Sequence, residues 1–369
     1  MKIWNIFILL TVIFFVIQGC GGIERETDPM VRDEVLELTD EAGLISQRAQ
    51  NLEEEGDFKG ARLLYEEMVD DYSDSPLIPE AIYRIGRCLE EEGEFSDAID
   101  WYEDLVDDYP DSDFAPEAQF RIGICLEEED ELLDAFEAYQ KLFDDYPGKG
   151  SLSEILNRQY AIGEAFMNGR KRLFVFFRIR SGLGTAEDIF RKILDNATFS
   201  KASTRAQYSL GRVLQMDGDY NGAILEYNQL LTNYPGTEMI PLALFNIGIC
   251  YYEEALSSDY DAGEVNKALQ NFTRFVKSFP DNPKRGEAEE KIIELIDYKA
   301  EKAYAIGNYY NSPDSYAGAR IYYQEVIDKY PESRYAALAK KKLAKLPEPV
   351  AGDEPRIISG EGQDDLKKK

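Results

Sequence analysis

The feature of this sequence that most constrains its fold is a pattern of residues that recurs every 37 positions. The segment YRIGRCLEEE, residues 83–92, aligns with FRIGICLEEE, residues 120–129, and the same offset relates Ala98 to Ala135. A fixed period of this length indicates a repeat protein, in which each copy buries its apolar face against its neighbours. The sequence therefore predicts a series of stacked copies.

Each copy carries the pattern of two helices joined by a tight turn. Ile82, Ile85 and Leu89 follow one another at spacings of three and four, which places them on one face of a helix. Gly93 marks the turn that follows. The second helix carries its own apolar series: Phe95, Ala98, Tyr102 and Leu105. Pro110 then ends the copy, because proline cannot continue the interior of a helix.

Gly86 lies inside the predicted first helix, where glycine costs about 1 kcal/mol of helix propensity relative to alanine. We expect such a residue where a neighbouring helix approaches closely. The succession of a small and a large residue, then Ala-x-x-x-aromatic, then proline resembles the tetratricopeptide repeat, although Ile82 stands where the repeat consensus places tryptophan. This resemblance implies an all-α solenoid of about seven helix-turn-helix units.

The repeat pattern divides the chain into segments. Three strongly acidic units are predicted within 39–150, three further units within 151–283, and a last unit within 284–346. Residues 347–369 are predicted to form a disordered tail, because two prolines close together end the helical pattern and polar residues follow.

The chain has no histidine, which removes the commonest general base and the commonest metal ligand. Cys88, Cys125 and Cys250 each follow the helical glycine of their unit by two positions. Equivalent positions in stacked copies point in equivalent directions, so these cysteines are predicted to be apolar packing residues rather than disulfide partners. We therefore expect no catalysis, no cofactor and no metal site.

The N-terminus has the pattern of a bacterial lipoprotein signal. Residues 3–17 are almost wholly apolar, a run that suits a signal-peptide core but is short for a membrane-spanning helix. The sequence IQGC at 17–20 resembles a lipobox, which implies a signal peptide at 1–19, acylation of Cys20 and a linker at 20–38. The glycine after the cysteine resembles lipoproteins sorted to the periplasmic face of the outer membrane. An uncleaved membrane anchor is the alternative.

Charge is concentrated in the first units. Residues 51–147 contain 32 acidic and 6 basic residues, a net charge of −26 out of the −30 of the whole chain. Such a field argues against a nucleic-acid partner, whose phosphates would be repelled, and against a face lying flat on an anionic bilayer. The acids form either a solvated surface or a face that recognises a basic partner.

One basic segment interrupts the fourth unit. Gly163 and Ala186 are 23 residues apart where Gly86 and Ala98 are 12 apart, so about eleven residues are inserted near 169–184. The candidate partner-binding residues of this insert are Arg170, Lys171, Arg172, Phe174, Phe176, Phe177, Arg178 and Arg180. Three interpretations remain open: the insert packs against the acidic units, docks a protein, or contacts lipid headgroups.

The last unit has a recognisable pattern of its own. An aromatic-rich segment at 302–310 is followed by YAGARIYY at 316–323 and by VIDKYPES at 326–333. This order resembles the outer membrane assembly lipoprotein family BamD/YfiO, in which a second helix ends in Tyr-Pro. The turn here reads Ala-Gly-Ala, and about seven repeats stand where the family carries about five.

That resemblance implies a membrane-anchored scaffold that helps to assemble outer-membrane β-barrel proteins. Its expected partners are a barrel-assembly subunit or extended substrate segments, with the membrane contacted through the lipid anchor. No nucleic acid and no small-molecule substrate are expected. The alternative is a repeat lipoprotein that serves as an adaptor in another envelope process, such as cell division, secretion or polysaccharide export.

Overall fold

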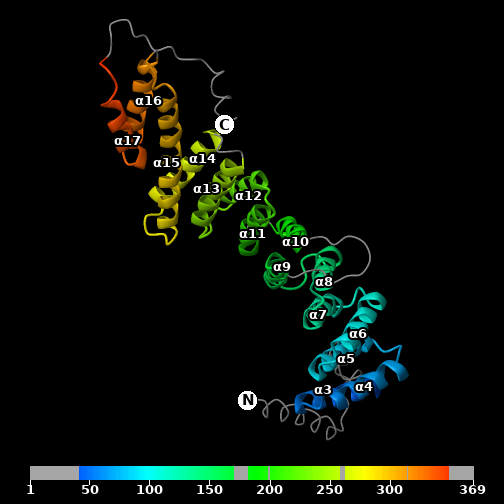
Figure 1. The fold of residues 1–369 in the computed structure, drawn as a ribbon. Helices are drawn as coiled ribbons and strands as arrows, with labels where there is room; N and C mark the ends of the chain where they lie inside the picture. The colour runs from blue at the N-terminus through cyan, green and yellow to red at the C-terminus, as the bar shows by residue number, and fades with distance from the viewer. Residues whose placement is uncertain (1–40, 170–181, 198–199, 258–261, 314, 349–369) are drawn as a thin grey trace, which may run out of the picture. The chain divides into compact units, whose positions relative to one another are not determined.

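A computed structural model describes residues 41–348 apart from 170–181, 198–199, 258–261 and 314 (Figure 1). The described residues form fifteen α-helices and no strand. The prediction of an all-α tetratricopeptide-repeat fold is confirmed. The predicted signal peptide, Cys20, the basic part of the insert and most of the predicted tail lie outside the described residues.

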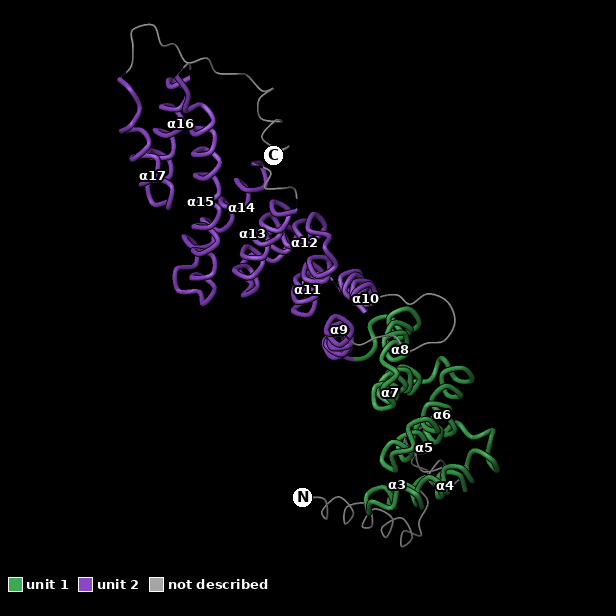
Figure 2. The backbone as a smooth tube through the Cα atoms, viewed as in Figure 1, with its two compact units in different colours: residues 1–150 green, residues 151–369 purple. Residues whose placement is uncertain are grey.

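Packing between helices divides the chain into two compact units, residues 1–150 and 151–369 (Figure 2). The helices of the first unit are α3 (Glu41–Glu55), α4 (Phe58–Asp71), α5 (Ile78–Glu92), α6 (Phe95–Asp108), α7 (Ala115–Glu128) and α8 (Leu132–Asp145). The helices of the second unit are α9 (Leu152–Met167), α10 (Gly182–Asn196), α11 (Lys201–Asp217), α12 (Tyr220–Asn233), α13 (Ile240–Ser257), α14 (Ala262–Ser278), α15 (Arg285–Tyr309), α16 (Tyr316–Lys329) and α17 (Arg334–Leu343). Within each unit, successive helices pack against one another.

The helices follow the predicted copies, with two differences. α10 begins at Gly182, so residues 182–184, which the sequence pattern assigns to the insert, form the first turn of this helix. The glycines do not prevent this, because their cost in propensity applies to the interior of a helix. Beyond the seventh helix pair lies α17, whose buried apolar residues are the small Ala336 and Ala339. Tyr335 and Leu343 of α17 are only partly buried, and two small buried alanines are too weak an apolar pattern to predict a helix from sequence.

The turn between the two helices of a copy requires a left-handed backbone. Gly93 has a φ of 83°, and 37 residues later Asp130 has a φ of 67°. Glycine reaches this region without a steric cost, and aspartate is one of the few other residues that visit it. The backbone geometry of this turn therefore favours the glycine that the sequence placed there.

In six of the seven copies, a helical glycine lies against an aromatic ring of the second helix. A Cβ atom added at Gly86 would lie 2.4 Å from Cε1 of Tyr102, far inside the contact distance of two carbon atoms. The other glycines meet their rings in the same way: Gly123 meets Tyr139, Gly163 meets Phe190, Gly211 meets Tyr227, Gly248 meets Phe272 and Gly307 meets Tyr323. The close approach expected from the position of Gly86 is confirmed.

Buried tyrosines make the fold less stable at alkaline pH. Burial is the largest cause that raises the pKa of Tyr65, Tyr102 and Tyr227, and neighbouring acids such as Glu90 add to it for Tyr102. The folded state therefore holds these phenolic protons more tightly than the unfolded state, in which tyrosine ionises near pH 10. Their contribution to stability is complete below about pH 10 and falls as the pH rises further.

We expect urea midpoints that are constant between about pH 8 and pH 9.5 and that decline above about pH 10. The measurement is a series of urea unfolding curves across this range, followed by circular dichroism and by the absorbance of phenolate. If all tyrosines ionised near pH 10 while the helical signal persisted, the burial described for these rings would be wrong.

Candidate functional site

Tyrosine, glutamate and arginine side chains link neighbouring copies in the first unit. The hydroxyl of Tyr102 in α6 donates to Oε1 of Glu90 in α5 at 2.7 Å, and the guanidinium of Arg121 in α7 donates to Oε2 of the same carboxylate at 3.0 Å. One copy earlier, Arg84 donates to Oε2 of Glu53 at 3.0 Å. Each of these carboxylates therefore accepts a hydrogen bond from an arginine of the following copy. These bonds fix how successive copies align in the stack.

The positions of these groups follow from the repeat itself. Glu90 lies four residues after Gly86, and Arg121 lies two residues before Gly123, the next helical glycine. Because residues four apart lie on one face of a helix, the acid and the glycine both face Tyr102. The glycine makes room for the ring, and the acid receives its hydroxyl.

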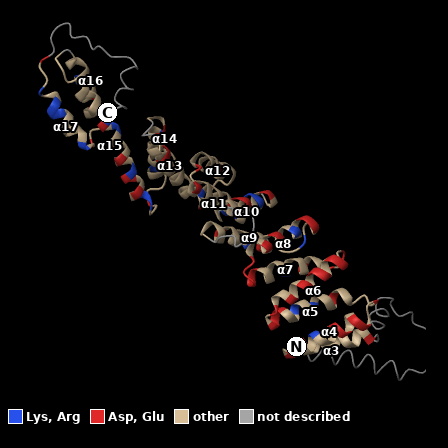
Figure 3. Ribbon diagram, turned by 45° about the vertical axis from the view of Figure 1, so that its right-hand side comes forward, with Lys and Arg blue, Asp and Glu red and all other residues tan. Residues whose placement is uncertain are grey.

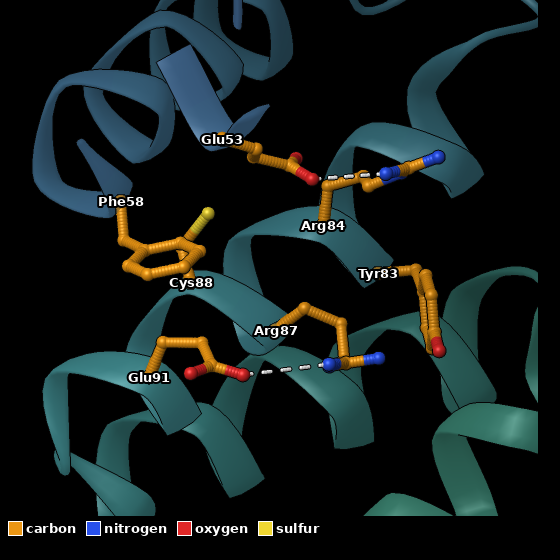
Figure 4. A pocket seen from close by; sticks show the side chains of 7 residues that line it. All are labelled: Glu53, Phe58, Tyr83, Arg84, Arg87, Cys88 and Glu91. Carbon is orange, nitrogen blue, oxygen red and sulfur yellow. Dashed lines mark hydrogen bonds and ion pairs between the residues drawn. The ribbon is translucent and has the colours of Figure 1, made fainter. Parts of the chain in front are cut away.

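Beside this network lies a cavity of about 280 Å³ in the first unit (Figure 4). Its lining residues come from three successive helices: Glu53 from α3, Phe58 from α4, and Tyr83, Arg84, Arg87, Cys88 and Glu91 from α5. Most of the α5 residues recur at intervals of three or four, so one face of this helix forms a wall of the cavity. A cavity of this size accommodates one or two side chains of a peptide.

The two arginines of the cavity differ in how firmly they are held. Arg84 donates to Glu53 at 3.0 Å and to Glu80 at 3.1 Å, and both are normal hydrogen-bond lengths. The acids nearest to Arg87 are Glu90 at 3.7 Å and Glu91 at 3.6 Å, which are ion pairs longer than a hydrogen bond. Arg87 is therefore the group best able to turn towards a carboxylate or a carbonyl oxygen of a ligand.

The remaining lining residues favour binding rather than reaction. Burial, followed by the charge of Glu53, raises the pKa of the Cys88 thiol to about 12, so it stays protonated at neutral pH and is a poor nucleophile. Phe58 and Tyr83 are half-buried and present ring surface to the cavity (Figure 4). The arrangement suits an extended segment that carries one acidic group and one apolar side chain.

The residues that the sequence singled out as partner-binding, Arg170 to Arg180 in the insert, lie outside the described residues. The sequence patterns did not predict the residues that line the cavity. The available signal was the pair Arg84 and Arg87, two of only 6 basic residues within 51–147. Their proximity to Glu53 and Phe58 depends on how α5 packs against α3 and α4, which the repeat pattern alone does not give.

Two further features bear on function. Among the helices that the structure describes, none combines the length and the apolar character needed to cross a bilayer. In the same part of the chain, no cluster of three or more cysteine and acidic side chains has an arrangement that could hold a metal ion. Cys88, Cys125 and Cys250 are free and buried, as their repeated position predicted.

The paired helices and their glycine–aromatic contacts define a tetratricopeptide-repeat protein. Residues 47–113 and 117–149 match family models of the tetratricopeptide repeat. Residues 179–339 match the YfiO family, whose members are described as outer membrane lipoproteins. Residues 179–339, which lie in the second unit, thus resemble the YfiO family, and the copies of the first unit resemble the tetratricopeptide repeat.

Curated relatives of the chain carry the name outer membrane protein assembly factor BamD. The relative from Caulobacter vibrioides is 25% identical over 164 residues, which cover 44% of this chain and 54% of the relative. The relative from Neisseria meningitidis serogroup B is 24% identical over 174 residues, which cover 43% of this chain and 65% of the relative. The chain thus spans less than two thirds of the length of either relative.

Among solved structures, the chain is similar to the C-terminal part of a repeat-containing protein from Cytophaga hutchinsonii. The TM-score is 0.36 at 16% sequence identity, and the superposition covers 79% of this chain and 98% of the other.

Proposed function

We propose that this chain is a membrane-anchored scaffold that binds protein partners during the assembly of outer-membrane β-barrel proteins. The observation that carries the proposal is the match of residues 179–339 to the YfiO family together with two relatives named as BamD. A chain of stacked helix pairs presents long surfaces to a partner, and this role needs no cofactor and no catalytic group. Its partners would be a barrel-assembly subunit or extended substrate segments.

The cavity of the first unit would contribute to this role by holding part of an extended segment. Arg87 would receive a carboxylate or a main-chain carbonyl, and the rings of Phe58 and Tyr83 would cover an apolar side chain. A single cavity of about 280 Å³ supplies only a modest affinity, so we expect partners that contact further surfaces of the chain as well.

Two features outside the described residues complete the proposal. Acylation of Cys20 would hold the chain at the periplasmic face of the outer membrane, because two or more acyl chains give stable anchoring. The insert would provide a docking element through Arg170, Lys171, Arg172, Phe174, Phe176, Phe177, Arg178 and Arg180. Apolar residues flanked by arginine are enriched at protein interfaces.

The proposal is tested by copurification of the anchored chain from membranes in mild detergent. We expect a barrel-forming outer-membrane protein among the partners. Arg87→Glu should reduce recovery of the partners by about tenfold, because a repelling charge replaces the attracting one at the cavity. Arg48→Glu is the matched control, since Arg48 is exposed on α3 outside the cavity, and it should leave recovery unchanged.

Deletion of residues 171–180 from the insert, which leaves α10 intact, separates the two docking elements. Loss of partners with an unchanged helical signal would support the insert as a docking element. Stable recovery of cell-division, secretion or polysaccharide-export proteins in place of a barrel-forming protein would contradict the proposed function and favour an adaptor of another envelope process.

A further inference from the structure

The end of the second unit has a charge opposite to that of the chain as a whole. Residues 333–347 contain five basic residues and no acidic one, in a chain of net charge −30. Three of the lysines, Lys340, Lys341 and Lys342, occupy the last turn of α17, which is visible as a basic segment in Figure 3. Lys345 follows beyond the end of the helix.

These lysines border a second cavity, of about 400 Å³, formed by α15, α16 and α17 and the segment that follows. Lys341, Lys342 and Lys345 line one part of it. Its apolar and aromatic lining residues are Tyr304, Tyr316, Leu338 and Leu346. No acidic residue belongs to the lining. The cavity therefore joins a positive rim to an apolar interior.

Contacts within the described residues do not account for the lysines. Arg334, at the start of α17, lies 3.6 Å from Asp297 and 3.8 Å from Glu301, so it is paired with acids of α15. Among the described residues, no acidic side chain lies within ion-pair distance of Lys341 or Lys345, and both are exposed.

The helix dipole explains only part of this pattern. Cations in the last turn of a helix are favoured by the partial negative charge there, which suits Lys340 to Lys342. The dipole does not explain Leu338, a residue that is 45% exposed and lines the cavity. An exposed apolar side chain within a basic rim is typical of a protein-binding surface.

We propose that this cavity docks an acidic segment of a partner protein. Carboxylates of the segment would pair with Lys341, Lys342 and Lys345, while an apolar or aromatic side chain between them would enter the space beside Leu338 and Tyr316. The proposal goes beyond the scaffold function, because it assigns a second recognition surface for acidic segments, in the second unit rather than the first.

The shape of the site favours a peptide over a lipid surface. An anionic bilayer would attract exposed lysines through charge alone and would leave the cavity and its apolar wall without an occupant. A volume of about 400 Å³ suits one or two side chains of a bound segment. Charge complementarity then selects acidic segments and excludes basic ones.

The test uses the full chain, purified in mild detergent, and fluorescence anisotropy of a labelled peptide in which a phenylalanine is flanked by glutamates. We expect this peptide to bind, and a peptide with lysines in place of the glutamates not to bind. The double substitution K341E/K342E should weaken binding by about tenfold or more, and Leu338→Asp should weaken it to a similar degree.

The control is K192E/K201E, which makes the same change in net charge at exposed lysines of α10 and α11. It should leave the affinity unchanged, and thermal melts should show that all variants keep the fold. Equal loss in the control would mean that only net charge matters, and the proposal would fail.

A second experiment measures binding of the chain to vesicles that contain phosphatidylglycerol. If they bound the chain through Lys341 and Lys342 regardless of Leu338→Asp, and the acidic peptide did not bind, the surface would be a lipid-binding one. That result would overturn the proposal.

Discussion

Gly86→Val should lower the free energy of unfolding by about 3 kcal/mol, because the new side chain has no space beside Tyr102. The first atom of any side chain at this position would lie 2.4 Å from Cε1 and 2.6 Å from Cζ of that ring. Tyr102 is fully buried and held by its hydrogen bond to Glu90, so it cannot rotate away without losing both packing and this bond. The measurement is guanidinium unfolding followed by circular dichroism.

Two comparisons make this expectation specific. Gly286→Val is the matched control, since a Cβ at Gly286 meets nothing within 4 Å, and it should change stability by less than about 0.5 kcal/mol. In the Gly86→Val background, Tyr102→Leu should restore part of the loss, which would appear as a favourable coupling in a double-mutant cycle. Equal destabilisation at Gly286, or no coupling with Tyr102, would show that the glycine–ring contact is not the cause.

The first copy shows why valine rather than alanine is the informative change. Ala49 precedes Tyr65 by sixteen residues, as Gly86 precedes Tyr102, and both Ala49 and Tyr65 are fully buried. A single methyl group is therefore accommodated in at least one copy of the repeat. We expect Gly86→Ala to cost less than Gly86→Val, because alanine also gains about 1 kcal/mol of helix propensity over glycine.

Cys20→Ser should remove the chain from the outer-membrane fraction. A serine has no thiol to carry the lipid that the lipobox resemblance implies, and each buried methylene contributes about 0.8 kcal/mol to anchoring. Mass spectrometry of the N-terminal peptide should show acylated Cys20 in the wild type and no lipid in the variant. Cys88→Ala, at a buried thiol of α5, should keep the lipid and the outer-membrane location.

The alternative at the N-terminus gives a different result. If residues 1–19 stay attached as a membrane anchor, the wild type keeps its first residues and carries no lipid. Cys20→Ser then changes the mass only by the exchange of sulfur for oxygen and leaves the fractionation unchanged. That outcome would contradict acylation while leaving the repeat fold and its cavities unaffected.

The repeat architecture could be predicted from sequence because it rests on local patterns. Gly86, Tyr102 and Gly93 each report on one contact or one backbone angle, and the 37-residue period repeats them. The free, buried cysteines followed from the same period. Such features need only the spacing of residues along a helix.

The cavities could not be predicted in this way, because they depend on distances between helices. Arg87 is one of several arginines near acids in the sequence, and only the packing of α3, α4 and α5 shows that its ion pairs are long and that a cavity lies beside it. α17 was missed for a related reason, since its buried apolar residues are two alanines, while Tyr335 and Leu343 are only partly buried and Leu338 is exposed.

Depletion of the chain in its own cell tests whether it acts in barrel assembly, with the amount of folded β-barrel protein in the outer membrane as the readout. We expect folded barrels to decline and their unfolded forms to accumulate in the periplasm, while other outer-membrane lipoproteins stay constant. Restoration by the wild type and not by Arg87→Glu would connect that role to the cavity of the first unit. Unchanged levels of folded barrels after depletion would contradict the account.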